Sequence, residues 1–493
     1  MSLRICLVNP PIREWAKPNQ VPMGLLMIST VLRENGHNVD IFDVNGPRLT
    51  QEEVRAWIAN QNYDLYGIGG LITQWNYIRW CTDVIKEYHP DTPIMAGGPV
   101  VSNSPKLFAQ RMAGVDVMVV GEGEHAVLDV VRDVELGNIT SNKSVTLTEQ
   151  PLDAPTRTGL CSSDIEIIKP VYQSPAISNL DELPFPDFDN LETVSIYRSN
   201  PVGGTNTKVK WIDGAAPDVS NLTLITTRGC PFRCRFCQPR YLGDAARSRS
   251  AEKICDDMER LVERYGVTYI HFTDELCFFS KRKALLFSEE VIRRGLQKVV
   301  QWGGATRFDI HDRESFESMA AGGCLHVGGG IESLSTALLK AMDKYQHLQC
   351  GVDSLVEKLR LGREIIEDVD TSFIIGYPGE TRETITETIL NMQRIDSMFR
   401  PDAVFFATPY PGTWLWDYAV KEGFIPDPIQ HIESLGENSV NQLMNFTEIP
   451  SEELRMWKRR LEQATMEVPN PVDLHVGPME WSGTTYSLSL IHI

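Results

Sequence analysis

Residues 221–240, NLTLITTRGCPFRCRFCQPR, place three cysteines directly after a short apolar and β-branched run. The run Leu222–Thr227 has the composition of a buried strand, and Cys230, Cys234 and Cys237 follow it with the spacing Cys-x-x-x-Cys-x-x-Cys. A zinc site normally takes four ligands, often from two Cys-x-x-Cys pairs, and a fully ligated four-iron cluster uses four thiolates. No further cysteine or histidine stands close to this trio in the sequence. The spacing therefore predicts a metal cluster with one iron left open to another ligand.

The cysteine loop opens a longer alternation of strands and helices. Helical stretches such as AEKICDDMERLVERYG separate six apolar runs that have the length of strands. Six strand–helix units predict a partial, open barrel related to the eight-stranded βα barrel, with its chemistry at the carboxyl ends of the strands. The six predicted strands are Leu222–Thr227, Thr268–Thr273, Val299–Gly304, Leu325–Gly330, Thr371–Gly376 and Ala403–Thr408.

The first part of the chain shows a similar alternation, and each of its strands ends in glycine or another loop former. This pattern predicts a doubly wound, Rossmann-like parallel sheet with helices on both faces. Ligands of such sheets bind beyond the carboxyl ends of the strands, where glycine lets the backbone approach them closely. The predicted strand segments are RICLVNPP (4–11), HNVDIFDVNG (37–46), DLYGIGGLITQ (64–74), PIMAGGPVV (93–101) and VDVMVVGEGE (115–124).

Four regions follow from these patterns, and the fold class is α/β. The doubly wound domain spans 1–137 and the partial barrel spans 216–414. Between them, 138–215 is rich in Ser, Thr, Asn, Pro and Asp, which predicts an irregular connection. The last region, 415–493, is charged and helical around SEELRMWKRRLEQA.

Composition and charge limit the possible partners and the location. The formal net charge is −19, so the chain has little positive field to attract phosphates, and we expect no nucleic-acid partner. No run approaches the length of about 18 apolar residues that a membrane span needs, and the opening MSLRICLVNPP lacks a signal peptide's cleavable segment. We therefore expect a cytoplasmic protein without a membrane span. In that compartment the cysteines outside the trio are expected to be small buried side chains.

The cysteine spacing, at the end of the first barrel strand, resembles the radical S-adenosylmethionine (SAM) superfamily. The resemblance implies that Cys230, Cys234 and Cys237 hold a [4Fe-4S] cluster and that SAM chelates the open iron. It also implies an electron donor such as flavodoxin or ferredoxin, whose electron cleaves SAM and releases a 5′-deoxyadenosyl radical. Cations near the trio favour the thiolate state, and four arginines bracket it in the sequence: Arg228, Arg233, Arg235 and Arg240.

Other strand ends resemble the SAM-binding positions of the superfamily. The resemblance implies that Phe236 stacks on the adenine, that Glu275, beside Asp274, binds the ammonium, and that Arg307 binds the carboxylate or ribose. It also implies that Glu332 and Ser333 contact the ribose and that Gly376 belongs to a Gly-Tyr-Pro-Gly turn near the adenine. An ordinary surface ion pair or turn is the alternative at each position.

A doubly wound domain ahead of such a barrel resembles the cobalamin-binding class of this superfamily. The similar segments are the NPP opening, LRENGHNVDIFD, AGGP, VVGEGE and LPFPDFD. The Asp-x-His-x-x-Gly motif of free-standing cobalamin domains is absent, and we expect His37 to be a surface or turn histidine; an empty, vestigial cobalamin fold is the alternative. The resemblance implies that strand-end loops enclose the nucleotide tail of cobalamin through Thr73, Gln74, Gly98, Pro99 and Glu122.

Together the resemblances imply a cobalamin-dependent methyltransferase that acts on an unactivated carbon of a small molecule or natural-product intermediate. Oxidative cyclisation or rearrangement, as in anaerobic magnesium-protoporphyrin ester cyclases, is the main alternative. Methylthiotransferases carry more cluster cysteines in their first domain than Cys6 and Cys81 could supply. A non-catalytic cobalamin or metal sensor would leave the strand-end residues of the barrel without a purpose. The substrate is expected near FATPYPGTWLWDYA, where Tyr410, Trp414 and Trp416 either line an aromatic pocket or pack in the core.

Overall fold

The computed structural model describes most of the chain. The greater part of the predicted irregular connection (138–215), the end of the C-terminal region, Arg240 and the single cysteines Cys161 and Cys350 lie outside the described residues. The described residues are 2–14, 17–139, 170–200, 220–238, 242–243, 245–345, 351–396, 399, 401–435 and 444–464.

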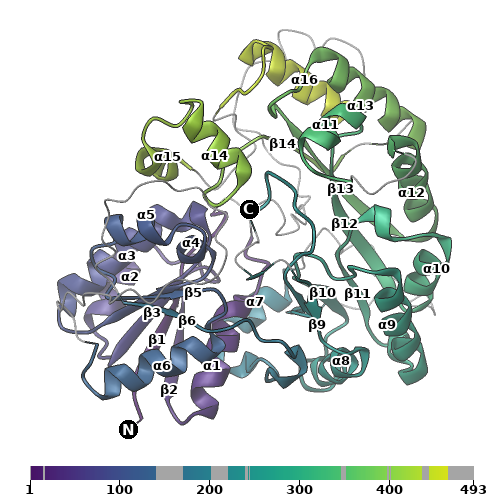
Figure 1. Cartoon of the computed structure of the whole chain (residues 1–493). Coiled ribbons are helices and arrows are strands. Elements are labelled where there is room, and N and C mark those ends of the chain that lie inside the picture. The colour runs from purple at the N-terminus through teal and green to yellow at the C-terminus, as the bar shows by residue number, and fades with distance from the viewer. Residues whose placement is uncertain are drawn as a thin grey trace.

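The first part of the chain folds around a sheet of six parallel strands in the order β2-β1-β3-β4-β5-β6 (Figure 1). Apolar side chains cover both faces, as expected for a parallel sheet between two layers of helices. Helices α1 and α6 lie on one face, and α2, α3, α4 and α5 lie on the other. The strands are β1 (Arg4–Asn9), β2 (Asn38–Asp43), β3 (Leu65–Gly69), β4 (Ile94–Gly97), β5 (Val117–Val120) and β6 (Val171–Gln173).

The helices of this domain begin and end at residues with clear local reasons. At the start of α2, for example, the hydroxyl of Thr50 accepts from the backbone N–H of Glu53 at 3.3 Å, and the Glu53 carboxylate accepts from the Thr50 N–H at 2.8 Å. This reciprocal capping box satisfies two backbone donors that the first helical turn leaves open. The helices are α1 (Met23–Glu34), α2 (Gln51–Ala59), α3 (Trp75–Tyr88), α4 (Pro99–Ser102), α5 (Pro105–Arg111), α6 (Gly123–Glu135) and α7 (Val194–Arg198).

Three parts of this domain differ from the sequence prediction. The strand predicted over 64–74 ends at Gly69, and a short 3₁₀ helix over Ile72–Gln74 follows it. A single strand is predicted over 93–101, but β4 ends at Gly97, because Gly98 turns the chain with φ +79° and Pro99 begins helix α4. The predicted irregular connection contributes β6, which pairs in parallel with β5 and completes the sheet. This three-residue strand is half exposed and too short to show a hydrophobic period in the sequence.

The second sheet also has six parallel strands, in the order β14-β13-β12-β11-β10-β7, and curves into a partial barrel (Figure 1). All six predicted barrel strands are confirmed in their predicted order, and with the first sheet they confirm the α/β fold class. A short antiparallel pair, β8 (Thr227–Arg228) and β9 (Arg247–Ser248), lies beyond β7. The barrel strands are β7 (Asn221–Leu224), β10 (Tyr269–Phe272), β11 (Gln301–Ala305), β12 (Cys324–Glu332), β13 (Asp368–Ile375) and β14 (Ala403–Phe406).

Amphipathic helices cover the outer face of the barrel. Helix α8, for example, begins where the hydroxyl of Ser250 accepts from the backbone N–H of Lys253 at 3.1 Å, and it ends at Gly266 in the left-handed conformation. The helices of this part are α8 (Ala251–Tyr265), α9 (Lys281–Arg294), α10 (Arg313–Ala321), α11 (Thr336–Ala341), α12 (Gly351–Ile365) and α13 (Arg382–Ile395).

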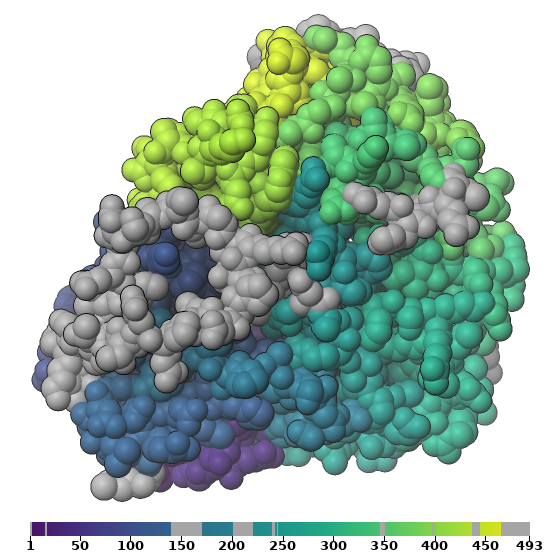
Figure 2. All heavy atoms as spheres, in the orientation of Figure 1, coloured from purple at the N-terminus to yellow at the C-terminus, as the bar shows by residue number. Residues whose placement is uncertain are grey.

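Three C-terminal helices, α14 (Trp414–Lys421), α15 (Pro428–Ser434) and α16 (Ser451–Gln463), tie the two parts together. Helix α15 lies on the first domain, where the Glu433 carboxylate accepts from Arg111 at 2.8 Å, while α16 lies on α13 of the barrel. The blue first domain and the teal start of the barrel also touch directly in the lower half of the molecule (Figure 2). Over the described residues, no helix has the length and apolar character needed to cross a membrane.

Candidate active site

The cysteine loop lies at the carboxyl end of β7. Its turn needs Gly229, which has φ +79°, and a Cβ there would lie 2.5 Å from the carbonyl oxygen of Ala245. Cys230, Cys234 and Cys237 are each half-buried, and all three line one cavity. Among the described residues, the lining of that cavity contains no other cysteine and no histidine. Three thiols around one space, with no fourth protein ligand in its lining, suit a cluster with one open iron.

Arg307, two residues after β11, is a cation that contacts one of these thiols. Its Nη1 donates to the sulfur of Cys234 at 3.8 Å, while Nε and Nη2 form a fork with the Asp309 carboxylate at 3.0 and 2.9 Å. The guanidinium lies between the rings of Phe232 and Tyr345, at 3.7 and 4.5 Å from their centroids. These contacts fix a positive charge at the cavity wall, with one donor directed at the cluster position.

Lys344 is a site residue that the sequence does not single out. Its Nζ donates to Glu332 at 2.6 Å, both side chains are buried, and Lys344 lines the cysteine cavity. The same ammonium lies 5.6 Å from the centroid of Phe236. Glu332 is therefore held in an ion pair, and the predicted ribose contact would have to share its carboxylate with Lys344. No sequence pattern predicts that Lys344 belongs to the site, because it follows a short helix about 100 residues after the cysteines.

The prediction that flanking arginines favour the thiolate state does not hold for Cys230 and Cys237. Burial raises the pKa of Cys230, and burial together with the neighbouring cysteines raises the pKa of Cys237 well above its ordinary value. Arg228 is not available to them, because it pairs with Glu124 in the domain interface. Burial therefore favours the protonated form of Cys230 and Cys237 until a metal replaces their protons.

Two acidic residues at the end of β10 have different tasks. Asp274 is buried and accepts from the backbone N–H groups of Thr226 and Thr227 at 2.7 and 3.0 Å, which fixes the strand end that leads into the cysteine loop. Glu275 is half-buried and lines the cysteine cavity. Burial, the largest cause, raises its pKa to about 7, and nearby Arg228 and Arg247 oppose the rise. A ligand ammonium would restore the charge of this carboxylate.

The structure leaves four of the predicted SAM contacts outside the cavity lining, and one of them is Glu332, the partner of Lys344. Phe236, inside the cysteine loop, is buried and meets Tyr377 edge-on, with ring centroids 6.5 Å apart. Gly376 has φ +84° in the turn after β13. Ser333 is buried, and its hydroxyl bonds with Thr388 at 2.9 Å, so its polar group is already engaged inside the fold. The cavity does include Glu275 and Arg307, together with the unpredicted Phe232, Leu276, Thr306, Gly330 and Lys344.

A second, larger cavity of about 400 Å³ opens at the carboxyl ends of the first sheet. It lies between the sheet and the helices α1 and α6, and residues of β1, β3, β4 and β5 line it. Gly67, Gly69 and Gly97 keep its floor free of side chains. The cavity is of a size suited to part of a large ligand, such as a nucleotide tail.

Four of the five predicted cobalamin contacts line this cavity: Gln74, Gly98, Pro99 and Glu122. Thr73 is not in the lining. The amide of Gln74 is already engaged, since its nitrogen donates to the carbonyls of Pro10 and Pro11 at 2.9 and 3.0 Å and its oxygen accepts from Leu71 at 2.7 Å. Gln74 therefore shapes the cavity by holding the loop after β1.

The described residues that line this cavity include no histidine. His37 lies at the opposite, amino end of the first sheet, where its Nδ1 accepts from the backbone of Leu3 at 3.3 Å. This position agrees with the expectation of a turn histidine. A ligand in the cavity would be held without an imidazole from the lining.

Buried ion pairs join the two cavities. Arg228, two residues before Cys230, pairs with Glu124 and lies 3.6 Å from Glu122, and Arg247 also pairs with Glu122. Glu122 further accepts from the backbone N–H of Ile177 at 2.8 Å. Breaking a buried pair of this kind costs about 3–5 kcal/mol, so the start of α6 and the cysteine loop are held in one arrangement. Glu122 thus serves the interface as well as the cavity wall.

The aromatic residues near the barrel mouth divide into core and surface. Tyr410 and Trp416 are buried in the core that joins α14 to the first domain, which supports core packing for these two. Trp414 is 41% exposed and stacks on Tyr418, with ring centroids 5.2 Å apart. The guanidinium of Arg235 lies 4.9 Å above the Trp414 ring.

The isolated cysteines behave as predicted wherever they are described. Cys6, Cys81, Cys255, Cys277 and Cys324 are all buried, and none of the eight described cysteines is in a disulfide. Their burial among apolar side chains gives them a packing role.

The two parts of the chain that carry these cavities each match a family model. The B12 binding domain matches residues 14–131, and the Radical SAM superfamily matches residues 224–391. The chain is a radical SAM enzyme with a B12-binding domain. Its cofactors follow from the two domains: a [4Fe-4S] cluster and SAM for the barrel, and cobalamin for the first sheet.

Relatives of this B12-binding radical SAM enzyme include two kinds of enzyme. It is 26% identical over 457 residues to an uncharacterized methyltransferase from Pyrococcus horikoshii, a match that covers 90% of this chain and 91% of the relative. It is 29% identical over 337 residues to the anaerobic magnesium-protoporphyrin IX monomethyl ester cyclase from Cereibacter sphaeroides. That match covers 68% of this chain but only 49% of the cyclase.

Solved structures share the fold of the B12-binding radical SAM enzyme. TsrM from Kitasatospora setae, a radical S-adenosylmethionine methyltransferase, superposes with a TM-score of 0.61 at 18% identity, over 85% of this chain and 76% of its own. OxsB, a cobalamin-dependent S-adenosylmethionine radical enzyme, also gives a TM-score of 0.61 at 18% identity, over 89% of this chain and 57% of its own. At these identities the agreement is one of fold.

Proposed function

We propose that this chain is a cobalamin-dependent radical SAM methyltransferase that acts on an unactivated carbon of a small molecule or natural-product intermediate. One observation carries the proposal: Glu275 lines both the cysteine cavity and the glycine-lined cavity. A molecule held at the three thiols and a molecule held at the end of the first sheet would therefore meet at one carboxylate. Methyl transfer with two cofactors needs this closeness, because reacting groups must be held within a few ångströms of each other.

The residues of both cavities fit the groups assigned to them. Cys230, Cys234 and Cys237 would hold three irons, and the fourth would stay open to SAM. The glycine floor of the second cavity gives a flat nucleotide tail room against the sheet, because no Cβ projects there. When bound, the cluster supplies the electron that cleaves SAM, and cobalamin supplies the carrier for the methyl group.

The side chains of the chain itself would bind and orient SAM. Glu275 would accept the SAM ammonium, which explains why a carboxylate is kept half-buried beside the cluster position. Arg307, already fixed by Asp309 through Nε and Nη2, would donate from Nη1, the nitrogen on the cysteine side, to the SAM carboxylate. Lys344 holds Glu332 in place for the ribose. Phe236, Ser333 and Gly376 stay predictions as adenine and ribose contacts, and Thr73, Gln74, Gly98, Pro99 and Glu122 stay predictions as cobalamin contacts.

Product analysis tests the proposal. Protein purified without oxygen, with its cluster reconstituted and cobalamin added, should convert SAM into both 5′-deoxyadenosine and S-adenosylhomocysteine. The Cys230→Ala variant should form no 5′-deoxyadenosine, because it cannot hold the cluster. Formation of 5′-deoxyadenosine alone, with every substrate offered, would contradict methyl transfer.

Oxidative cyclisation or rearrangement is the second candidate, favoured by the 29% identity to the magnesium-protoporphyrin ester cyclase. The two functions differ in what happens to the methyl group of SAM. SAM labelled with ¹⁴C in that methyl group should label the product of a methyltransferase and leave the product of a cyclase unlabelled.

We further propose that the reductant is a small electron-transfer protein such as flavodoxin or ferredoxin, and that the enzyme works in the cytoplasm. The buried, unbridged single cysteines support a reducing compartment. Reduction of the cluster by purified flavodoxin, followed by electron paramagnetic resonance (EPR), tests the first part. Localisation of a tagged chain in its native cells tests the second.

A further inference from the structure

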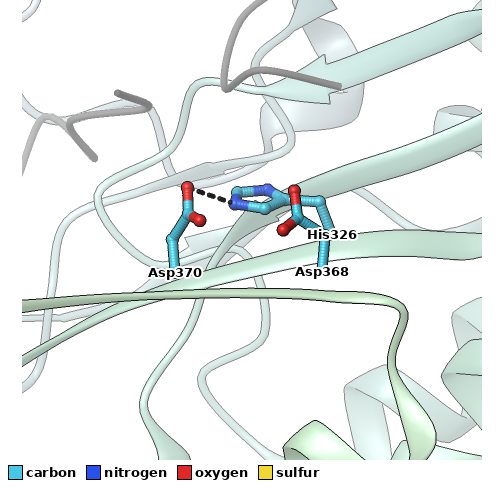
Figure 3. Close-up of side chains that lie close together, drawn as sticks. All are labelled: His326, Asp368 and Asp370. Atoms are coloured by element: carbon cyan, nitrogen blue, oxygen red, sulfur yellow. Dashed lines mark hydrogen bonds and ion pairs between the residues drawn. The ribbon is translucent and has the colours of Figure 1, made fainter. Parts of the chain in front are cut away.

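A second polar cluster lies in the barrel at the end opposite to the cysteines. His326 near the start of β12 and Asp368 and Asp370 at the start of β13 place three ligand atoms within 4.8 Å of one another (Figure 3). The Nε2 of His326 lies 3.0 Å from the Asp370 carboxylate. Neither the radical chemistry nor cobalamin binding uses these residues, which are separated from the cysteines by the length of the strands.

Strand register explains why these side chains meet. His326 is opposite Asp368, and Gly328 is opposite Asp370, in the parallel pair β12–β13. Val327 and Val369 point to the helices and join the outer core, so the alternating His326, Asp368 and Asp370 point into the barrel. Gly328 leaves the space between them open, since a Cβ there would lie 3.4 Å from the His326 ring.

Buried polar atoms around the cluster lack partners. His326 is 1% exposed, and its Nδ1 has no hydrogen-bond partner in the described structure. The hydroxyl of Tyr269, on β10, is fully buried and also has none. This hydroxyl and His326 both border the space next to Gly303. A Cβ placed on Gly303 would lie 2.5 Å from the hydroxyl and 2.8 Å from the His326 Cβ. Buried polar groups are almost always satisfied, so the space around His326 is incomplete without a further group. A cation shared with Asp370 would bind Nε2, the ring nitrogen that faces that carboxylate.

A further carboxylate crowds the same place. Asp402, directly before β14, accepts from the backbone N–H of Thr371 at 2.5 Å. Its carboxyl group is a close neighbour of the carboxylates of Asp370 and Asp368. Three carboxylates in one buried space repel each other unless a proton or a cation is shared between them.

We propose that His326, Asp368 and Asp370, with Asp402 beside them, bind a divalent transition cation such as Mn²⁺ or Zn²⁺ at the amino end of the barrel. Imidazole and carboxylate together suit these ions. Ligand atoms in such a shell are about 3–4 Å apart, so small side-chain rotations would close the site. The cation would cross-link β12, β13 and β14 where the open barrel has no further strands to close it. The site is independent of the proposed methyl transfer.

Metal titration tests this site in the complete, cluster-loaded protein. After anaerobic passage over a chelating resin, Mn²⁺ is added and free Mn²⁺ is counted by EPR. Wild-type protein should bind one Mn²⁺ per chain tightly, and its melting temperature should rise by several degrees. Asp370→Asn and His326→Gln should weaken this binding by more than about 100-fold, since even the loss of an outer partner costs 10–100-fold. Absorbance of the iron cluster reports that the variants remain folded.

Asp116→Asn is the matched control, because Asp116 is an equally sheltered aspartate at the amino end of the first sheet, paired with Lys86 at 2.7 Å. It should bind Mn²⁺ like the wild type. Pulsed EPR on the wild type needs no variant, and an imidazole ¹⁴N coupling to the bound Mn²⁺ is expected. Absence of a stoichiometric site in the wild type, absence of ¹⁴N coupling, or unchanged binding in both variants would overturn the proposal.

Discussion

The two sheets of this protein have the same number of parallel strands and yet offer opposite environments at their carboxyl ends. The first ends in glycines and a cavity of about 400 Å³. The second ends in thiols, Glu275, Arg307 and a buried lysine. The comparison teaches that a parallel sheet fixes only where a ligand binds, while the residue types after each strand decide whether that place offers space or reactive groups.

The same comparison applies to the way charges are arranged. At the first sheet, Glu122 and Glu124 are neutralised by Arg228 and Arg247 and close the domain interface. At the barrel, the pKa of Glu275 is raised to about 7, so its charge depends on what binds beside it. Fixed pairs therefore hold the two domains together, and one incompletely satisfied carboxylate faces the ligands.

The largest expected effect comes from removing a thiol at the barrel end. Cys234→Ala should abolish both the brown colour of the reconstituted protein and the cleavage of SAM, because two thiolates cannot hold the cluster. Iron and sulfide analysis with an assay of 5′-deoxyadenosine measures the loss. Cys255→Ala is the control, since Cys255 lies on the buried face of α8, and this variant should keep its colour and its cleavage of SAM. A brown, active Cys234→Ala protein would refute the cluster assignment.

The next effect tests whether the first sheet contributes only space. A Cβ on Gly97 would meet Val119 at 3.6 Å, so Gly97→Ala should fold and bind cobalamin nearly normally. Gly97→Leu would fill the cavity and should weaken cobalamin binding by about 10- to 100-fold, the cost of overpacking by 1–3 kcal/mol. Equilibrium dialysis with hydroxocobalamin measures both. Equal affinities for the two variants would show that cobalamin binds elsewhere.

A smaller effect is expected at the carboxylate that the two cavities share. Glu275→Gln should weaken SAM binding by about tenfold, since a hydrogen bond to a charged group contributes about 1.5–3 kcal/mol. The SAM affinity of Glu275→Asp should lie between those of the wild type and Glu275→Gln. Calorimetric titration of cluster-loaded protein with SAM measures this, and Glu314→Gln, an exposed residue on α10, provides the control. SAM affinity that is the same in Glu275→Gln and wild type would remove Glu275 from the site.

A buried carboxylate at the carboxyl end of the barrel makes the stability of the protein depend on pH. Burial raises the pKa of Glu380, in the turn after β13, to about 8, and its carboxylate accepts from the Gly376 N–H. A raised folded-state pKa favours folding below the unfolded pKa near 4.5, and this stability is lost as pH rises to about 8, by up to 1.4 kcal/mol per pH unit. Glu380→Gln should flatten this decline in melting temperature between pH 5 and 8.

The control for this pH profile is Glu383→Gln, because Glu383 is exposed in the first turn of α13, three residues after Glu380. It should keep the decline of the wild type. A profile of Glu380→Gln that matches the wild type would show that Glu380 is already ionised in the folded protein.

Sequence patterns predicted most of the fold because they are local. Each barrel strand is a continuous apolar run bounded by loop formers, so its period is visible in a few residues. The three-residue strand β6 could not be predicted in this way, because its pairing with β5 depends on a neighbour about 50 residues away. Gly98 and Pro99 show the same limit, because a glycine with positive φ followed by helix α4 looks like the end of a strand in the sequence.

The amino-acid sequence was enough to predict the alternation of strands and helices, the cysteine spacing and the loops at which ligands bind, because each of these depends on residues close together in the chain. The folded structure was needed to show that Lys344 holds Glu332, that Arg307 rather than Arg228 faces the thiols, and that His326 meets Asp368 and Asp370. Those contacts join residues from different strands and loops. Their distances are set by register and packing, which no local pattern records.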